Sequence, residues 1–246
     1  LTPTLMESMS ISTIQLYYGG IAAISAVLFI VLSRETPPTP PCPPGGEVRA
    51  LMLDGLKHAL TVKAFWFDLA IAFIGLGIFN GITTWVESII RPRGFTPSDA
   101  GTLGALMIVG GVIGAVVIPA LSDKQRKRQL YLYVAFIGAI PGLIGLTFAT
   151  SSTLLFASAF VLGFFLTSAM PIAMQYGAEV THPTPEGTSN GLIQLFGQAA
   201  VVFVFIMEAL KSADGSFTRA LLLAIGLLVI SLFLISQMKD PKELIS

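Results

Sequence analysis

Charge is scarce in this 246-residue chain: 11% of its residues are Asp, Glu, Lys or Arg, whereas a soluble domain carries about 25%. The formal net charge is zero, so the sequence offers no basic surface of the kind that binds nucleic acid. Cysteine is rarer still, since Cys42 is the only one, and it cannot form a disulfide within the chain. We therefore expect neither a soluble domain, nor a nucleic-acid partner, nor a fold held by disulfides.

Residues that commonly carry catalysis or bind metals are also few. The chain has two histidines, His58 and His182, and both lie between apolar runs. Neither a nucleophile with its base nor a cluster of metal ligands can be assembled at one depth from these residues. We predict that the protein is not an enzyme, has no metal site and needs no cofactor, and that His58 is a solvated loop residue.

Apolar residues, in contrast, make up 54% of the chain, and its mean hydropathy is +0.81. They are gathered in seven runs, at about 12–33, 64–90, 98–121, 129–150, 153–180, 187–211 and 216–237. A helix needs roughly 20 apolar residues to cross a hydrocarbon core about 30 Å thick. The sequence therefore predicts an all-α integral membrane protein with seven spans. The odd number of spans, in a chain that opens on Leu1, leads us to expect a fragment.

Basic residues are unevenly divided between the two sides that alternate spans define. Ten lie in 34–63, in 122–128 and after 237, and four lie in the other connections: Arg91, Arg93, Lys211 and Arg219. Because Lys and Arg accumulate in cytoplasmic loops, the side with ten should face the cytoplasm. We predict a plasma or inner membrane protein whose C-terminus is cytoplasmic.

The longest break between spans is 34–63. Six of the eight residues from Pro37 to Pro44 are proline, so this tract cannot be helical. Residues 47–62 recover a helical pattern with one apolar face, which predicts a short amphipathic helix at the cytoplasmic membrane interface. The predicted organisation is one helix at 1–33, a linker at 34–63, a six-helix bundle at 64–237 and a tail at 238–246.

Glycine and proline are frequent inside the spans. Glycines at 75, 77 and 81 and at 101, 104, 110, 111 and 114 would let helices approach closely in lipid. We expect Pro141 with Gly142, and Pro171, to interrupt their helices. Such interruptions serve either packing or a moving hinge, and the sequence does not choose between them.

Five polar side chains inside the spans are candidates for a substrate pathway: Asn80, Thr84, Glu87, Gln194 and Gln198. The first three are spaced i, i+4 and i+7, and the two glutamines i and i+4, so each set shares a helix face. Polar groups near the membrane midplane are costly unless they are paired or face water. A solute pathway is therefore expected, and hydrogen bonding between helices is the alternative.

Two further residues in the second span receive structural roles. Trp85 is expected to be an interfacial anchor. Asp68, in the first turns of its helix, is assigned to the positive end of the helix dipole and to no transport role.

Five charged residues next to the spans are candidates for a cytoplasmic gate: Asp123, Arg126, Arg128, Glu179 and Glu186. Asp123 could accept hydrogen bonds from a helix start at 187–190, which Thr188 or Ser189 would cap. Glu179 is placed within reach of Arg126 or Arg128. These contacts would latch several helix ends together; a positively charged loop and an ordinary turn are the alternative.

Two stretches carry a family resemblance. Asp123-Lys124-Gln125-Arg126-Lys127-Arg128, after Pro119, resembles the loop between the eighth and ninth helices of the major facilitator superfamily, with Pro119 and Arg126 in place of two glycines. The other stretch is more specific, and comprises Gly163-Phe164-Phe165-Leu166-Thr167, Met170-Pro171, 179–183, 186–192 and Gln198. It is similar to one branch of that superfamily, the feline leukaemia virus subgroup C receptor-related transporters.

The resemblance implies a twelve-helix transporter with two six-helix halves, of which this chain would supply the last helix of the N-terminal half and all of the C-terminal half. Such halves rock about a central site. The glutamine that matches Gln198 lies at the ligand site of this branch, whose animal members resemble choline and ethanolamine carriers. An aromatic residue occupies the position of Asn80 in choline carriers, and aromatic faces favour quaternary ammonium ions, so Asn80 argues against choline itself.

We predict a secondary active or facilitative transporter that moves a small polar or cationic organic solute by alternating access. Its expected partners are membrane lipid, the solute and the N-terminal half of the same transporter. One alternative is a proton-coupled antiporter or exporter of drugs or haem-like compounds, with Glu87 as the intramembrane carboxylate. A non-transporting receptor or scaffold is a remote alternative, because the outer loops are too short for a folded domain.

Overall fold

The computed structural model describes residues 9–33 and 52–240. The chain divides into two units, 1–49 and 50–246. All regular structure in the described residues is helical, and seven of these helical segments are long and apolar enough to cross a membrane. The predicted all-α fold with seven candidate spans is therefore confirmed.

The first unit contains one described helix, α2 (Ile11–Leu32). It begins where the apolar run begins, because the Ser10 hydroxyl accepts a hydrogen bond from the Thr13 backbone N–H at 3.3 Å and so caps the first turn. The helix is apolar around its whole circumference, and a helix of this kind needs an apolar solvent or a covering partner.

The second unit contains the remaining elements. They are α3 (Met52–Thr61), α4 (Lys63–Ile90), η1 (Arg91–Arg93), α5 (Pro97–Gln125), α6 (Arg128–Phe148), α7 (Ser152–Val180), α8 (Glu186–Ala199), α9 (Val202–Ala209) and α10 (Thr218–Ser236). The predicted runs match these helices to within a few residues, except that the run at 187–211 forms two helices rather than one. The predicted helix at 47–62 corresponds to α3.

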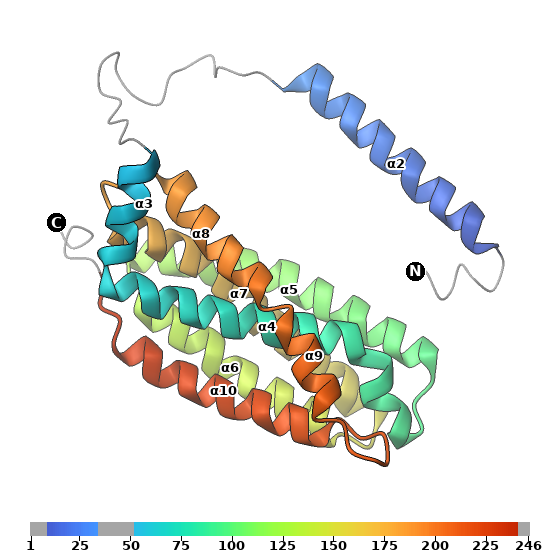
Figure 1. Ribbon diagram of the computed structural model, residues 1–246. Helices are drawn as coiled ribbons and strands as arrows, with labels where there is room; N and C mark the ends of the chain where they lie inside the picture. Colours follow the sequence, from blue (N-terminus) through green and yellow to red (C-terminus); the bar gives the residue numbers. More distant parts are fainter. Residues whose placement is uncertain (1–8, 34–51, 241–246) are drawn as a thin grey trace. The chain divides into compact units, whose positions relative to one another are not determined.

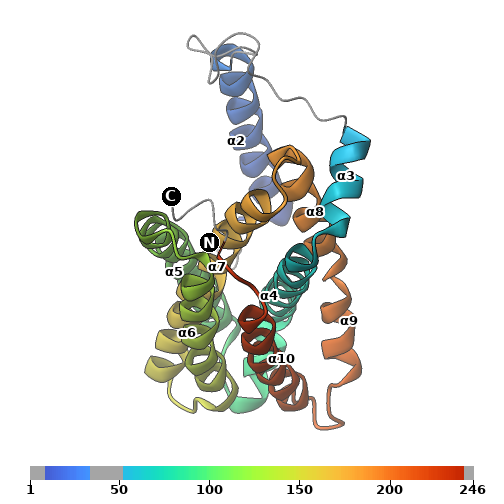
Figure 2. The same ribbon diagram turned by 90° about the vertical axis from the view of Figure 1, so that its left-hand side faces the viewer.

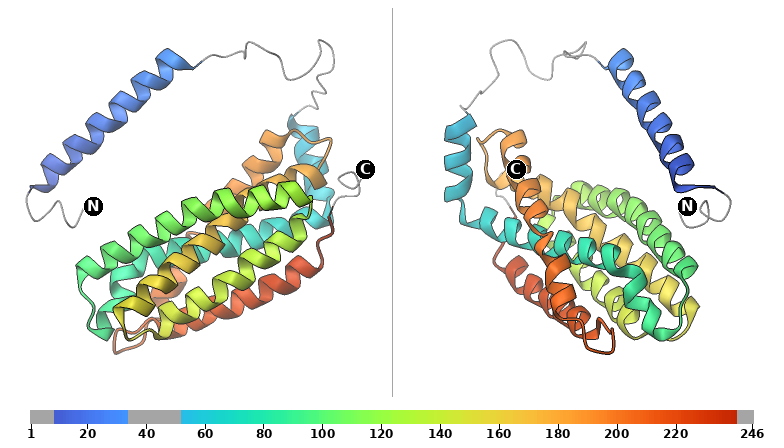
Figure 3. Two further views of the ribbon diagram at one scale, coloured as in Figure 1. Left: turned by 180° about the vertical axis from the view of Figure 1, so that it is seen from behind. Right: turned by 45° about the vertical axis from the view of Figure 1, so that its right-hand side comes forward.

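The long helices of the second unit form two layers. One layer consists of α8, α9, α4 and α10, which are in front in Figure 1. The other layer consists of α5, α7 and α6, and the left view of Figure 3, seen from behind, shows α7 between α5 and α6. The layers meet where α4 packs on α7 and α10 packs on α6 (Figure 2). Their core consists of aliphatic and aromatic side chains such as Ile78, Leu103, Phe136 and Leu162.

Glycines allow α5 and α7 to touch backbone to backbone. A Cβ added to Gly110 or Gly114 of α5 would collide with the carbonyl oxygen of Phe160 or Phe164, and a Cβ on Gly163 of α7 would collide with that of Met107. The predicted close approach of glycine-bearing helices is thus observed.

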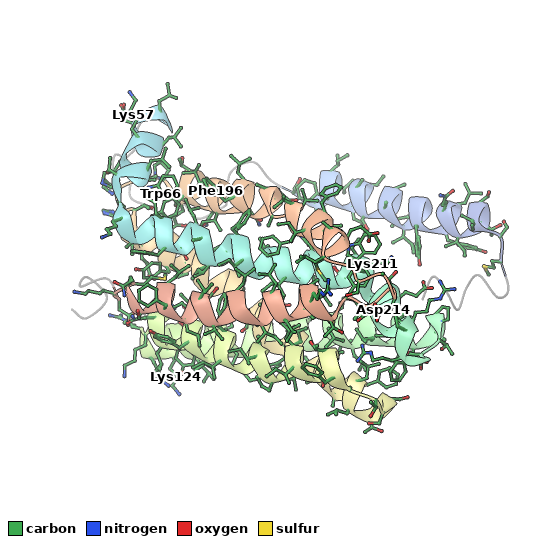
Figure 4. The ribbon with its side chains drawn as sticks, turned by 60° about the horizontal axis from the view of Figure 1, so that its bottom comes forward. Lys57, Trp66, Lys124, Phe196, Lys211 and Asp214 are labelled. Carbon is green, nitrogen blue, oxygen red and sulfur yellow. The ribbon has the colours of Figure 1, made fainter. Side chains whose placement is uncertain are left out.

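The two ends of this bundle differ in their number of basic residues. The end that includes Lys57 and Lys124 (Figure 4), together with Arg128 and Lys239, is here called the basic end. Lys211 and Asp214 lie at the opposite end, with Arg91, Arg93 and Arg219. The structure therefore groups the loops of this unit as the alternation of spans predicts, and the cytoplasmic placement of the basic end remains a prediction.

The predicted interruptions at two prolines are wrong. Pro141 lies inside α6 and Pro171 inside α7, and both helices continue through them. Gly142 instead provides close packing, because a Cβ there would lie 2.6 Å from the Leu162 backbone nitrogen. The break occurs between α8 and α9, at Ala200 and Val201, where the sequence has neither proline nor glycine.

The amphipathic helix α3 packs on protein at the basic end. Thr184, in the loop between α7 and α8, donates from its hydroxyl to the Gly55 carbonyl at 3.1 Å. His58 Nδ1 lies 3.0 Å from the same hydroxyl oxygen. His58 is exposed, as expected for a solvated residue, but it belongs to a helix and not to a loop, and it is hydrogen-bonded.

Candidate functional site

The α8–α9 break divides one of the seven candidate membrane spans found in the described residues. Ala200 and Val201 donate their N–H groups to the carbonyls of Gly197 and Gln198, three residues back, at 3.1 Å each. Such a tight turn replaces the regular α-helical ladder. Irregular backbone at membrane depth is tolerated where it is covered by protein or lines a water-filled cavity. Gln198 lies in the last helical turn before this break.

The two glutamines of α8 have exposed side chains, whereas the intervening Gly197 is buried against α4. A Cβ added to Gly197 would collide with the Leu76 side chain, so Gly197 and Leu76 lie at the same level. Asn80 follows Leu76 by one helical turn, about 6 Å along the axis. Gln198 and Asn80 thus belong to contacting helices and lie at nearby levels.

The three polar residues of α4 have different environments. Asn80 is half-buried, and Thr84 and Glu87, toward the opposite end, are exposed on the surface of the six-helix unit. None of these three side chains makes a hydrogen bond to another helix among residues 9–33 and 52–240. These polar groups are therefore available on the α4 surface to bind a solute or a facing helix. The alternative, that they form hydrogen bonds between helices, is not observed among the described residues.

The half-buried Trp85 side chain, expected to be an interfacial anchor, binds protein. Its indole N–H donates to the Val204 carbonyl of α9 at 3.0 Å, and its ring lies 5.5 Å from the Phe217 ring, centroid to centroid. The side chain therefore fastens α9 to α4 just beyond the break. Gly77 and Gly81 of α4 make the same pairing possible, because α9 side chains occupy the space next to them.

A cavity of about 160 Å³ lies between α4, α6 and α7. Its lining is apolar except for Thr167, and includes Leu76 and Phe79, the residue before Asn80. Within the described residues, the buried Thr167 hydroxyl oxygen has no hydrogen-bond partner. Thr167 was quoted in the family motif, but its role as the polar group of a cavity was not predicted.

At the basic end, Arg128 is the centre of a charged cluster. Its Nε lies 3.2 and 3.3 Å from the two Glu179 carboxylate oxygens, and its Nη2 lies 2.9 Å from Oε1. The same guanidinium also donates to the Ser122 hydroxyl at 3.2 Å and to the Asp123 carboxylate. Arg128 thereby joins the ends of α5, α6 and α7, and Gln175 adds a hydrogen bond to Glu179 at 2.8 Å.

Three of the five gate candidates come together in this cluster. Arg128, Asp123 and Glu179 form the cluster, and the predicted reach of Glu179 to Arg128 is confirmed. Arg126 takes the left-handed conformation (φ 53°) that ends α5, and Glu186 is exposed in the first turn of α8. The structure does not bring Glu186 into the cluster.

The proposed capping of α8 is corrected. The helix begins at Glu186 after Pro185, and neither Thr188 nor Ser189 is its N-cap. Asp123 binds the Arg128 side chain rather than this helix start. Both partners are ionised in a guanidinium–carboxylate bond, whereas only the carboxylate is ionised in a bond from a backbone N–H, and this difference favours the Arg128 side chain.

The predicted role of Asp68 is also corrected. The sequence suggested a carboxylate that complements the helix dipole, but Asp68 is 0% exposed, and neither of its carboxyl oxygens has a hydrogen-bond partner among the described residues. The sequence signal that could have found it is a lone acidic residue flanked by apolar residues, Phe67 and Leu69, inside a predicted span.

Comparison with known proteins fits this architecture. The family profile described as Major Facilitator Superfamily matches residues 1–205. The chain belongs to the major facilitator superfamily. Its members are membrane transporters and not enzymes, which confirms the prediction that the protein is not an enzyme.

Several relatives lie in the branch that the sequence motifs indicated. The chain is 28% identical to zebrafish (Danio rerio) solute carrier family 49 member A3, over 82% of this chain and 44% of the relative. It is 26% identical to the rat (Rattus norvegicus) choline/ethanolamine transporter FLVCR2, over 85% of this chain and 41% of the relative. An uncharacterized protein of Archaeoglobus fulgidus is 34% identical, over 92% of this chain and 99% of the relative. The chain thus spans less than half the length of these two animal relatives.

Proposed function

We propose that this chain forms the last helix of the N-terminal half and the six-helix C-terminal half of a transporter that moves a small polar or cationic organic solute by alternating access. The observation that carries the proposal is the exposed glutamine pair of α8, which ends at a break in a candidate membrane span near the level of Asn80 on the contacting helix α4. Polar groups and irregular backbone meet there, and each is costly in lipid unless it faces water or a partner.

The exposed polar faces of α4 and α8 would then border a central pathway, and an N-terminal half, in the same polypeptide or in a second one, would supply the facing wall. Gln198 and Asn80 would contact the solute near mid-depth, with Gln194 and Thr84 above and below them. Glu87 would lie toward the mouth at the opposite end. Exposed side chains on a six-helix unit are what such an interface between halves requires.

The Arg128 cluster would act as the cytoplasmic gate. It holds the ends of α5, α6 and α7 in one arrangement, and its Asp123 carboxylate is 64% exposed and able to interact with a partner across the pathway. Arg126 and Glu186 would contribute charge at the same end. The accumulation of basic residues there supports a cytoplasmic orientation of this end, and with it of the C-terminus.

The relatives named as choline/ethanolamine transporters make these two amines the first solutes to test. Asn80 provides an amide instead of an aromatic face, so it can hydrogen-bond a primary ammonium or a hydroxyl group, whereas a quaternary ammonium donates no N–H bond. We therefore propose that ethanolamine and similar small hydroxyamines are preferred over choline.

Uptake of radiolabelled ethanolamine and choline into proteoliposomes tests the proposal. Gln198→Ala should lower the affinity for the transported amine about 5- to 150-fold, the equivalent of one or two lost hydrogen bonds of about 1–1.5 kcal/mol each. Leu195→Ala, at an exposed apolar position of the same helix, is the matched control and should leave the affinity unchanged. Equal affinities for wild type and Gln198→Ala would remove Gln198 from the site.

A further inference from the structure

One carboxyl group near the basic end takes no part in the pathway or the gate described above. Asp68, in the second turn of α4, is fully buried. Among residues 9–33 and 52–240, neither Oδ1 nor Oδ2 has a hydrogen-bond partner. A native buried polar group without a partner is rare and requires an explanation.

The surroundings of this carboxyl group are closely packed. A Cβ added to Gly177 of α7 would lie 2.8 Å from Asp68 Oδ2, 2.6 Å from the Ile193 side chain of α8 and 3.2 Å from the Phe65 ring. Ala59, Leu69 and Ala72 belong to the same apolar cluster. Asp68 is thus enclosed where α4, α7 and α8 come together.

The Tyr176 phenol of α7 is a titratable group near Asp68. This phenol donates its own proton to the Lys239 carbonyl at 3.1 Å, so it leaves Asp68 without a donor. Three further ionisable groups at this end have other partners. Arg128 binds Asp123 and Glu179, His58 bonds Thr184, and Asp240 accepts from the Gln129 backbone N–H at 2.9 Å.

Two kinds of ligand could neutralise a buried carboxylate. A metal cation such as Ca²⁺ or Mg²⁺ takes six or more oxygen ligands, and no group of three His, Cys, Asp or Glu side chains occurs in the described part of the chain. A proton needs one carboxyl oxygen and no further ligand. An ionised carboxylate without a partner costs far more to bury than a neutral carboxyl group, so a proton fits this enclosure.

We propose that Asp68 is a proton-binding site that holds its proton while the basic ends of α4, α7 and α8 are packed together and releases it when they separate. On separation, water reaches the carboxyl group, its O–H bond breaks, the proton passes to water and the carboxylate becomes hydrated. A proton bound in one state and not in the other biases the equilibrium between them. This inference rests on the proposed alternating access and adds coupling to the pH gradient, through Asp68 instead of Glu87.

Infrared difference spectroscopy on the protein in lipid nanodiscs at neutral pH tests the site. The wild-type spectrum minus the Asp68→Asn spectrum should contain the C=O stretch of a protonated carboxyl group, which shifts when H₂O is replaced by D₂O. Asp54→Asn, which changes an exposed residue on α3, is the control and should remove the bands of an ionised carboxylate. A wild-type minus Asp68→Asn spectrum with ionised-carboxylate bands alone would overturn the proposal.

Folding of the variants gives a second, independent readout. A neutral carboxyl group has neutral replacements, so Asp68→Asn or Asp68→Leu should retain the thermal stability of the wild type in detergent. Loss of the folded state in both variants would mean that an ionised Asp68 holds a partner, and it would also overturn the proposal.

Arg128→Gln separates failure of the site from failure of the gate. If opening the cluster admits water to Asp68, the protonated carboxyl band weakens in this variant. The band could also be present in the wild type and unchanged in Arg128→Gln. This result would leave the proton site in place but would contradict both the release of the proton and the role of the cluster as a gate. A missing wild-type band refutes the site whatever the transport assay shows.

Discussion

The charged cluster at the basic end allows one stability prediction in detail. Arg128 and Glu179 have side chains that are 6% and 12% exposed, and three donor–acceptor contacts of 2.9–3.3 Å join them. Arg128→Gln leaves the Glu179 carboxylate nearly buried without its cation. Removing one partner of a buried ion pair costs about 3–5 kcal/mol, and because Gln175 still bonds Glu179, we expect about 3 kcal/mol.

The Asp123 side of the cluster should respond differently. The Asp123 side chain is 64% exposed, and exposed ion pairs contribute about 0.2–1 kcal/mol. We therefore expect Asp123→Asn to change stability by less than about 1 kcal/mol. If Asp123 belongs to the gate, this variant should nevertheless lower transport with little loss of folded protein.

Reversible unfolding in mixed detergent and lipid micelles, followed by tryptophan fluorescence, measures both free energies. Arg128→Gln should shift the folding equilibrium by a factor on the order of 100. The double variant Arg128→Gln with Glu179→Gln should recover part of the loss, because no buried charge is then unpaired, with a coupling energy of about 1–3 kcal/mol. Equal costs for Arg128→Gln and Asp123→Asn, or purely additive costs in the double variant, would refute the reasoning.

Two further predictions concern packing and selectivity. Gly114→Ala should destabilise the protein by about 1–3 kcal/mol or more, because its Cβ would collide with the Phe164 carbonyl. Gly104→Ala, with open space around it, should instead stabilise α5 by roughly 0.5–1 kcal/mol. Thermal unfolding of the two variants checks this prediction, and similar losses of stability in both would contradict it. Asn80→Tyr should raise the affinity for choline relative to ethanolamine, because an aromatic face over a quaternary ammonium contributes about 0.5–2 kcal/mol. Competition between the two amines for uptake measures the ratio of their affinities. An unchanged ratio would show that Asn80 does not contact the amine.

Much of the fold could be predicted from the sequence because lipid imposes strict requirements on length and polarity. Each apolar run is close to the length of a membrane-spanning helix, and the glycines of α5 mark the helix that approaches α7 most closely. The basic loops gathered at one end because successive spans must alternate in direction. These features depend on local composition, which the sequence contains.

The misses involve tertiary partners, which local composition does not specify. Pro141 and Pro171 were expected to interrupt their helices, but both helices continue past them. The break lies instead at Ala200, where the sequence has neither proline nor glycine. Trp85 donates a hydrogen bond to Val204 of α9, which is 119 positions away. Asp68 looked like a helix-end carboxylate because its burial depends on Gly177 and Ile193, which are more than a hundred residues along the chain.

The candidate site divides in the same way. The contact between Arg128 and Glu179 followed from charges at adjacent helix ends, and the structure contains it. The roles of Gln198, Gln194, Asn80, Thr84 and Glu87 in a pathway remain predictions, because they depend on a facing wall as much as on these helices.

The most direct test of a water-filled pathway is the reaction of single cysteines with a membrane-impermeant, positively charged methanethiosulfonate. In a background with Cys42→Ser, which removes the only native thiol, we expect Gln198→Cys to react and to be protected by the transported amine. Phe233→Cys, at an exposed apolar position of α10, should stay unmodified in the bilayer. A Gln198→Cys thiol as inert as the one at position 233 would contradict the account, because Gln198 would then face lipid.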